Sequence, residues 1–320
     1  MKISNNSTNR KSIFSIEELR DAARSDNTRI AYDKGWDSFV SWCESVGLVP
    51  REAQTEDVVR YFIAVGGNDP KNSNKKLSIN TLRLFRSGLN YRWRQMGINS
   101  PAAEKVIDDI LLGLAKTRNE KPRRVKALRE FQIISMLSAC NQNLYGMRDA
   151  AIISLGFSAA LRRSEICELQ IEDLERKSSD KMILHIRRSK TDPQGSGQSI
   201  ALLEGKSIMP IKHLEYWIHA TGINSGYLFQ TLKRGGAVSG QPLDPGEIAR
   251  IVKRYAKKVG LDPQNYSGHS LRAGFVTSAA AHHARLDKIM EVTRHKNAET
   301  LMKYIRDEES FNDHAGSSFL

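Results

Sequence analysis

A polar, strongly basic segment near the middle of the chain limits how the rest of the sequence can fold. It runs from Lys116 to Lys126 and holds one proline and few apolar residues. A segment of this composition adds little to a hydrophobic core and is typical of a solvated linker. The chain has 320 residues, and a domain usually takes about 100 to 200, so each side is long enough to bury its own core. We therefore predict two domains that meet near Pro122.

The segment before the linker predicts an all-helical domain over residues 15–116, preceded by a disordered tail at 1–14. Its apolar residues recur at helical spacing, and several of these runs start at a capping residue or stop at a glycine. Ser15 and Glu18 have the spacing of a capping box, and Ser100 followed by Pro101 is typical of another helix start. We expect helices near residues 15–24, 27–46, 55–65, 78–96 and 101–116.

The segment after the linker predicts a mostly helical domain with a small antiparallel β-sheet. Two runs rich in β-forming residues, 182–186 and 199–203, flank a glycine-containing loop and predict paired strands. Helical periodicity predominates elsewhere, near residues 129–140, 147–158, 210–220, 245–259, 270–282, 286–293 and 298–306. The predicted fold class is thus mainly α, with a basic linker at 117–127, a second domain at 128–308 and a C-terminal tail at 309–320.

Charge and composition narrow the classes of function. Lys and Arg number 49 against 36 Asp and Glu, a net charge of +13 that favours a polyanionic partner. The 40% of hydrophobic and 27% of charged residues exclude a disordered, fibrous or membrane-spanning protein. Because the chain lacks an apolar run of about 20 residues and a signal peptide, we expect a cytoplasmic protein with no membrane partner. Cys43, Cys140 and Cys167 are far apart and predict reduced core thiols.

A basic stripe is predicted on the helix near residues 78–96. Arg83, Arg86, Asn90 and Arg94 recur at three- and four-residue spacing on a face distinct from the apolar one. An ordinary solvated helix face has similar residues, but the positive charge of the whole chain favours a nucleic-acid surface. Arginine neutralises phosphates and pairs with guanine, and asparagine pairs with adenine. We therefore predict that this stripe contacts DNA.

Groups able to bind a phosphate are concentrated in the second domain. They lie in Leu161-Arg162-Arg163-Ser164-Glu165, in Ser267-Gly268-His269-Ser270-Leu271-Arg272, and in His295 with Tyr304 nine residues later. Each residue alone could be an ordinary core or surface residue. In this order, with Lys190 in the predicted hairpin, the set resembles the tyrosine site-specific recombinases of the phage integrase family. The segment 267–274 and Met302-Lys303-Tyr304-Ile305-Arg306 are most similar to simple Cre-like and Xer-like members.

The resemblance implies the integrase catalytic fold and a role for each matched residue. Arg162 and Arg272 would hold the scissile phosphate, which suits planar guanidinium groups that bind two oxygens each. Tyr304 would be the nucleophile and Lys190 the general acid for the 5′ hydroxyl. His269 would accept a proton or donate to the phosphate, and His295 would donate a hydrogen bond to it. Glu165, three residues after Arg162, would orient a guanidinium.

Some assignments rest on the family position alone. Arg163 competes with Arg162, and the leucine directly before Arg162 selects the latter. Arg187, Arg188 and Lys190 are all basic, and only the motif separates them. We expect the remaining basic residues of these segments to contact the DNA backbone: Arg123, Arg124, Arg163, Arg187 and Arg188. One residue departs from the pattern, because Arg294 precedes His295 where many members have glycine.

The resemblance further implies the reaction and the assembly. The enzyme would cut and rejoin double-stranded DNA through a 3′-phosphotyrosyl intermediate, without ATP, metal or cofactor. Two subunits would occupy each site and four would form the synaptic complex, with the tail at 309–320 docking on a neighbouring subunit. The need for accessory proteins stays open. A monomeric type IB topoisomerase, which nicks and reseals DNA with the same groups, and a non-catalytic DNA-binding regulator are the alternatives.

Overall fold

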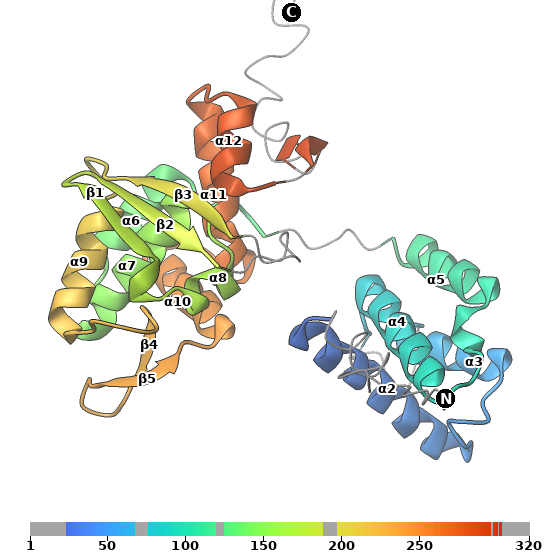
Figure 1. Cartoon of the computed structure of the whole chain (residues 1–320). Coiled ribbons are helices and arrows are strands. Elements are labelled where there is room, and N and C mark those ends of the chain that lie inside the picture. Colours follow the sequence, from blue (N-terminus) through green and yellow to red (C-terminus); the bar gives the residue numbers. More distant parts are fainter. Residues whose placement is uncertain are drawn as a thin grey trace, which may run out of the picture. The chain divides into compact units, whose positions relative to one another are not determined.

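The chain divides into two compact units, one ending at Pro122 and the other starting at Arg123. The computed structural model describes residues 24–67, 76–119, 125–187, 197–295, 297–299 and 301–302. Both units consist mainly of helices, and the second also contains small antiparallel sheets (Figure 1). The predicted mainly α fold class is therefore confirmed. Within the described ranges, no helix combines the length and the apolarity needed to cross a membrane.

The first unit is built from capped helices, as its sequence predicts. It contains α2 (Asp26–Val46), α3 (Thr55–Gly66), α4 (Ile79–Gln95), a 3-10 turn at Pro101–Ala103 and α5 (Lys105–Arg118). The Ser78 hydroxyl accepts a hydrogen bond from the amide of Thr81 at 3.1 Å and so caps α4. Gly47 ends α2 in the left-handed conformation, with a φ of 73°. The helix predicted at 15–24 lies almost entirely outside the described residues.

Aromatic side chains form the core of the first unit. Phe39, Tyr61 and Trp93 are fully buried. The ring of Phe39 lies edge-on to both others, with centroid distances of 5.1 Å to Tyr61 and 5.3 Å to Trp93. Buried rings in this arrangement remove large apolar areas from water and add a specific edge-to-face attraction.

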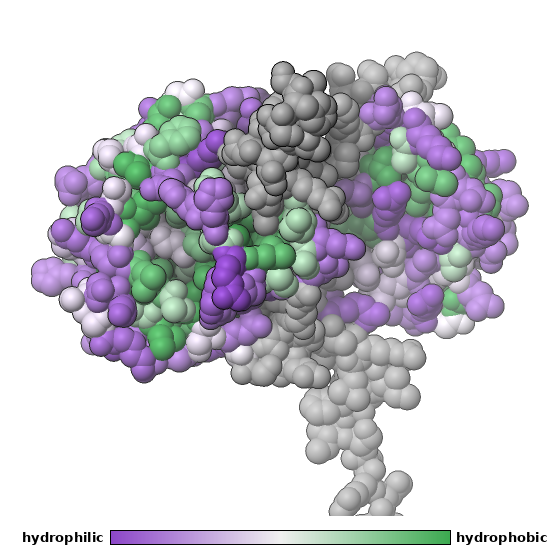
Figure 2. Space-filling model, turned by 90° about the horizontal axis from the view of Figure 1, so that it is seen from above, coloured by the Kyte–Doolittle hydropathy of each residue, from purple (hydrophilic) through white to green (hydrophobic). Residues whose placement is uncertain are grey.

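The visible surface of the described residues is mostly hydrophilic, with hydrophobic side chains scattered among the polar ones (Figure 2).

The second unit surrounds the buried helix α7. Its helices are α6 (Glu130–Ser138), α7 (Leu144–Ser158), α8 (Arg163–Glu168), α9 (Pro210–Thr221), α10 (Pro245–Lys258), α11 (Gly268–Ala281) and α12 (Leu286–Thr293). Residues 148–157 of α7 are all buried, because most of their side chains are apolar and the helix packs against α6, α9 and α11. A helix predicted at 298–306 falls mostly outside the described residues.

Two antiparallel sheets lie in the second unit. One has the strand order β1 (Leu174–Ser178), β2 (Lys181–Ile186) and β3 (Gln198–Leu203), and the other pairs β4 (Gln230–Leu232) with β5 (Val238–Pro242). The sequence predicted β2 and β3, which alternate exposed and buried side chains. It did not predict β1, because the residues Leu-Glu-Arg-Lys-Ser offer no buried face.

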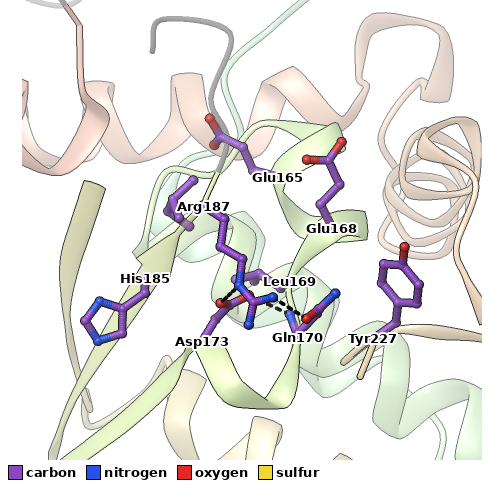
Figure 3. A pocket seen from close by; sticks show the side chains of 9 residues that line it. Glu165, Glu168, Leu169, Gln170, Asp173, His185, Arg187 and Tyr227 are labelled. Atoms are coloured by element: carbon purple, nitrogen blue, oxygen red, sulfur yellow. Dashed lines mark hydrogen bonds and ion pairs between the residues drawn. The ribbon is translucent and has the colours of Figure 1, made fainter. Parts of the chain in front are cut away.

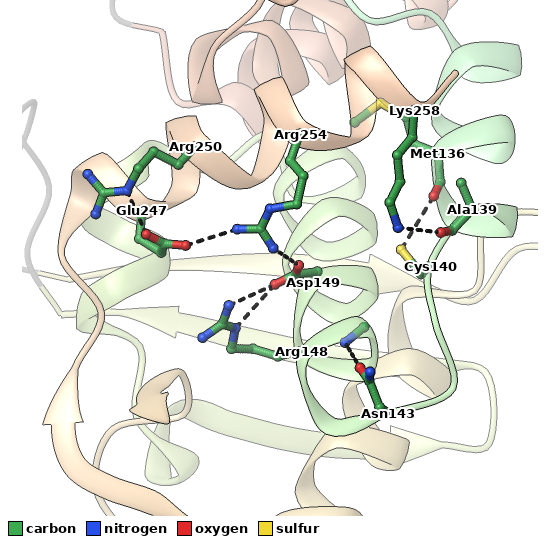
Figure 4. Close-up of polar contacts among 11 residues, drawn as sticks. Met136, Ala139, Cys140, Asn143, Arg148, Asp149, Glu247, Arg250, Arg254 and Lys258 are labelled. Carbon is green, nitrogen blue, oxygen red and sulfur yellow. Dashed lines mark hydrogen bonds and ion pairs between the residues drawn. The ribbon is translucent and has the colours of Figure 1, made fainter. Parts of the chain in front are cut away.

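An ion-pair network around a buried carboxylate joins α7 to α10. Asp149 is fully buried and accepts hydrogen bonds from Arg148 at 3.0 Å and from Arg254 at 2.9 Å (Figure 4). Arg254 also contacts Glu247 on its own helix at 3.2 Å. Burial raises the pKa of Asp149, although both arginines oppose that effect. Because a buried carboxylate is tolerated only when paired, the network fixes α10 against the central helix.

The three cysteines are free thiols, as the sequence predicts. Cys43 and Cys167 are buried, and Cys140 is half-buried. Burial raises the pKa of Cys43 and of Cys140 to about 11, and that of Cys167 to about 12. Thiols with such pKa values are poor nucleophiles at neutral pH. We therefore assign them to packing.

Candidate active site

Three segments that are far apart in the sequence bring their polar groups together in the second unit. Arg162 lies at the N-terminus of α8, Arg272 lies within α11, and His295 follows α12. The helix α11 packs against both α7 and α12, so the three groups meet where these helices converge. The structure thus places Arg162, Glu165, Arg272 and His295 in one polar cluster, which we call the arginine cluster. It also includes Arg294, for which the sequence predicts no role in catalysis or DNA binding.

Arg272 is the buried centre of the arginine cluster. Only 6% of the residue is exposed. Its Nη1 donates to the carbonyl of Ala160 at 2.7 Å, and its Nη2 donates to the carbonyl of Thr293 and to His295 Nε2, the latter at 3.3 Å. Ala160 has a φ of 47°, in the left-handed region that is strained for a residue other than glycine. Arg272 therefore holds both a strained turn after α7 and the end of α12.

Glu165 links Arg162 to Arg294. Its Oε1 accepts from Arg162 Nη1 at 2.7 Å. Its Oε2 accepts from the backbone amide of Arg162 and from Arg294 Nη2, both at 2.8 Å. Burial alone would raise the pKa of Glu165, but the charge of Arg294 and the hydrogen bonds from both arginines lower it to about 2. The carboxylate is therefore ionised at neutral pH, and it orients the Arg162 guanidinium.

His295 is held as a neutral ring in this arrangement. Its Nδ1 lies 2.8 Å from the Thr293 hydroxyl, which itself donates to the carbonyl of Ile289 at 2.7 Å. Nδ1 is thus the protonated nitrogen, and Nε2 accepts from Arg272. Burial and the positive charges of Arg272, Arg162 and Arg294 lower the pKa of His295 to about 4. To donate from Nε2, the role expected from the sequence, His295 must therefore first take up a proton.

Gly268 and Gly274 lie where neighbouring segments approach the backbone of α11 too closely for a larger side chain. A Cβ at Gly268 would lie 2.4 Å from Cγ of Arg163, so the aliphatic part of that side chain passes directly over the start of α11. A Cβ at Gly274 would lie 1.9 Å from the carbonyl oxygen of Leu128, which is far closer than atoms can approach. Leu128 also donates to the carbonyl of Ser270 at 3.0 Å. Small residues here let neighbouring segments reach the backbone of α11.

The remaining predicted site residues differ in what the structure describes of them. His269 is exposed in the first turn of α11, on the helix that carries Arg272. Arg163 is half-buried, with its stem over Gly268. The other predicted residues lie outside the described parts of the chain: Arg123, Arg124, Arg188, Lys190 and Tyr304.

Arg187 lines a pocket of about 440 Å³ next to the arginine cluster. Figure 3 shows its guanidinium bonded to Asp173 and to Gln170. Glu165 and Glu168 also line this pocket. Asp173 is buried, so its carboxylate holds the Arg187 stem close to the end of β2. The sequence did not indicate Asp173, because it lies in the 3-10 turn Ile171–Asp173, 14 positions from Arg187, and no local spacing relates the two residues.

The predicted basic stripe on α4 is divided by contacts within the first unit. Arg86 donates to the carbonyl of Ala102 at 2.8 Å and forms an ion pair with Asp108. Asn90 accepts a hydrogen bond from the Ser100 hydroxyl. Arg83 and Arg94 are exposed. Arg86 and Asn90 thus fasten the segment before α5 to α4, and the two exposed arginines are the members of the stripe best able to reach a phosphate.

Comparisons with known proteins agree on one family. Residues 126–310 match the phage integrase family. The integrase/recombinase xerD homolog of Selenomonas ruminantium is 30% identical over 300 residues, which cover 92% of this chain and 85% of that protein. Recombinase cre of Escherichia phage P1 is 22% identical over 293 residues, which cover 85% of this chain and 82% of that protein.

Solved structures share the fold. XerH site-specific recombinase bound to palindromic difH substrate, in a post-cleavage complex, gives a TM-score of 0.60 at 14% identity and covers 91% of this chain and 79% of that chain. A lambda integrase dimer bound to a COC' core site gives a TM-score of 0.59 at 16% identity, with 92% and 75% covered. At such identities the likeness establishes a common architecture.

Proposed function

The chain belongs to the phage integrase family, and from this membership we propose that it is a site-specific tyrosine recombinase, an enzyme that cuts and rejoins DNA. The observation that carries the proposal is the arginine cluster. Arg162, Arg272 and His295 come from separate helices, yet they meet within the unit that contains the family match. A cluster of positive groups, two of which share the Glu165 carboxylate, is suited to a phosphate that gains negative charge during the reaction.

In this proposal, Arg162 and Arg272 bind the non-bridging oxygens of the scissile phosphate. Arg162 keeps 14% of its side chain exposed while Glu165 fixes its direction. Arg272 is immobilised by two backbone carbonyls before any DNA binds. Groups that are oriented in advance stabilise the transition state without reorganising during the reaction. His295 supplies a further hydrogen bond once it is protonated, and the phosphate's negative charge favours that protonation.

The covalent steps are assigned to Tyr304 and Lys190. The Tyr304 oxygen would attack the phosphorus, so a bond from tyrosine to the 3′ phosphate forms as the bond to the 5′ oxygen breaks. Lys190 would give a proton to that leaving oxygen, and His269 would accept the tyrosine proton. The phosphodiester energy stays in the phosphotyrosyl bond, so the hydroxyl of a second strand reseals the DNA without ATP.

DNA binding and assembly follow from the same proposal. The first unit would lie on DNA with Arg83 and Arg94 on the phosphate backbone, helped by the linker residues Arg123 and Arg124. Arg163, Arg187 and Arg188 would contact the backbone near the cleaved bond. XerH and lambda integrase were solved on DNA, the latter as a dimer, and we propose two subunits per site and a homotetramer on two sites. Residues 309–320 would dock on a neighbouring subunit.

Covalent trapping tests the proposal. A binding sequence is first selected from randomised duplex DNA with Tyr304→Phe, and a duplex nicked beside that sequence is then incubated with each protein. Wild type should give a denaturation-resistant adduct, and Tyr304→Phe should give none. Tight binding without any adduct would instead favour a DNA-binding regulator. Relaxation of supercoiled DNA without exchange between two sites would favour the monomeric topoisomerase.

A further inference from the structure

Arg294 is a buried arginine in a position that is unfavourable for its backbone. It ends α12 with a φ of 56°, in the left-handed region. Residues other than glycine adopt this region at a cost, and such outliers persist where the surrounding structure enforces them. The backbone amide of Arg294 donates to the carbonyl of Met290 at 2.7 Å, which closes the helix end. Arg294 therefore lies in a strained turn directly before His295.

The Arg294 side chain is buried, and its hydrogen-bonded contact among the described residues is with Glu165. Only 4% of the side chain is exposed. Its Nη2 contacts Glu165 at 2.8 Å, and its Nε and Nη1 are buried without a hydrogen-bond partner among the described residues. Leaving two donors unsatisfied inside the protein is unfavourable. A strained backbone and two unsatisfied donors at one residue are poorly explained by packing alone.

The ion pair between Glu165 and Arg294 connects two separate parts of the arginine cluster. Glu165 is on α8 and Arg294 follows α12, and the two residues are 129 positions apart. The same carboxylate holds the side chain and the amide of Arg162. On its other side, Arg294 adjoins His295 and the Thr293 carbonyl that binds Arg272. The ion pair thus joins the element that carries Arg162 to the one that carries His295.

We propose that Arg294 is a positioning residue, whose ion pair with Glu165 fixes Arg162 relative to Arg272 and His295. It touches no reacting atom. The positive charge of Arg294 also offsets the negative charge of Glu165, so that Arg162 remains attractive to a phosphate. This role rests on the proposed function, because it concerns the phosphate that Arg162 binds.

Substitutions at Arg294 separate this role from simple filling of space. Arg294→Gly relieves the backbone strain and removes the ion pair, and Arg294→Lys keeps a positive charge. The matched control is Arg285→Met at the start of the same helix, where the arginine is 78% exposed and pairs with Asp287 at 2.9 Å. For each protein, the affinity for the selected nicked duplex and the single-turnover rate of adduct formation are measured.

We expect Arg294→Gly to form adduct about 10 to 100 times more slowly than wild type, as for small displacements of a reacting geometry. Its affinity for DNA should change less than about threefold, since the proposal assigns Arg294 no DNA contact. Arg294→Lys should recover part of the rate, and Arg285→Met should match wild type. If Arg294→Gly does not fold, Arg294→Lys and Arg294→Gln, which differ mainly in charge, decide the same question: equal rates overturn the role.

Two further measurements distinguish positioning from stability. If Arg294 acts through Glu165, adding Arg294→Gly to Glu165→Gln should not slow adduct formation further, whereas multiplied losses would overturn the role. The pKa of His295, followed by NMR, should rise in Arg294→Gly because a neighbouring positive charge is lost, and an unchanged pKa would contradict the geometry. Wild type without adduct defeats the proposed function. Adduct formation at equal rates in wild type and Arg294→Gly defeats the positioning role alone.

Discussion

Replacing Glu165 with glutamine should destabilise the second unit by about 3 kcal/mol at neutral pH. The carboxylate has a pKa of about 2, against 4.5 for an unperturbed glutamate. At about 1.4 kcal/mol for each pKa unit, this difference corresponds to roughly 3 kcal/mol of preference for the ionised form. A separate argument agrees, because removing one partner of a buried ion pair costs about 3 to 5 kcal/mol. In Glu165→Gln, Arg162 and Arg294 both lose the carboxylate charge that they share.

The same contact predicts a pH dependence of stability. Because the folded state lowers the pKa of Glu165, its stabilisation is fully present above about pH 4.5 and is lost as the pH falls toward 2. Wild type should therefore lose this part of its unfolding free energy over that range. Glu165→Gln has no titrating group at position 165, so its unfolding free energy should depend less on pH over that range.

Urea unfolding followed by hydrogen exchange and mass spectrometry measures this effect, since peptides from α7 and α8 report on the second unit alone. The matched control is Glu215→Gln, which also removes a carboxylate from an arginine but at the surface, where Glu215 is 50% exposed. We expect less than about 1 kcal/mol for that control. A loss in Glu165→Gln no larger than in Glu215→Gln, or an unchanged acid profile, would refute the reasoning.

Other perturbations give separate expectations. Gly274→Ala should lower the unfolding free energy of the second unit by about 2 to 4 kcal/mol in urea titrations, because the added carbon would push Leu128 out of the core. The control Gly113→Ala places its added carbon more than 4 Å from any neighbouring atom, so it should be neutral or stabilising. Arg83→Ala and Arg94→Ala should each weaken DNA binding and reduce the salt dependence of the affinity by about one phosphate contact; an unchanged slope in filter-binding titrations would remove them from the interface. DNA binding should be coupled to proton uptake by His295, whose pKa is about 4 in the free protein, and calorimetry in buffers of different ionisation enthalpy should detect this uptake in wild type and not in His295→Gln.

Local signals made much of the fold predictable. Caps, glycines and the spacing of apolar residues depend on neighbours within a few positions, so α2, α4 and the paired strands β2 and β3 follow from the sequence. The strand β1 does not, because its exposed residues carry no alternation. It is a strand because β2 offers it hydrogen-bond partners, which is a property of the folded sheet.

The candidate site divides in the same way. The contact between Arg162 and Glu165 spans three residues and was predictable from helical spacing. The second partner of Glu165 was not, because Arg294 follows α12, 129 positions away, and tertiary packing brings it near. For the stripe on α4, the sequence predicted the helix face but not the contacts that two of its residues make. Helical spacing identified Arg86 and Asn90 as surface groups, while their contacts with the segment before α5 depend on tertiary packing.

The two carbonyl contacts of Arg272 have a thermodynamic consequence. A free arginine side chain can occupy many rotamers, and restricting it costs up to about 2 kcal/mol of conformational entropy. Here Ala160 and Thr293 restrict it during folding. The Arg272 guanidinium is therefore already ordered when a phosphate binds. The loss of side-chain entropy lowers the free energy of unfolding of the protein and does not lower its affinity for DNA.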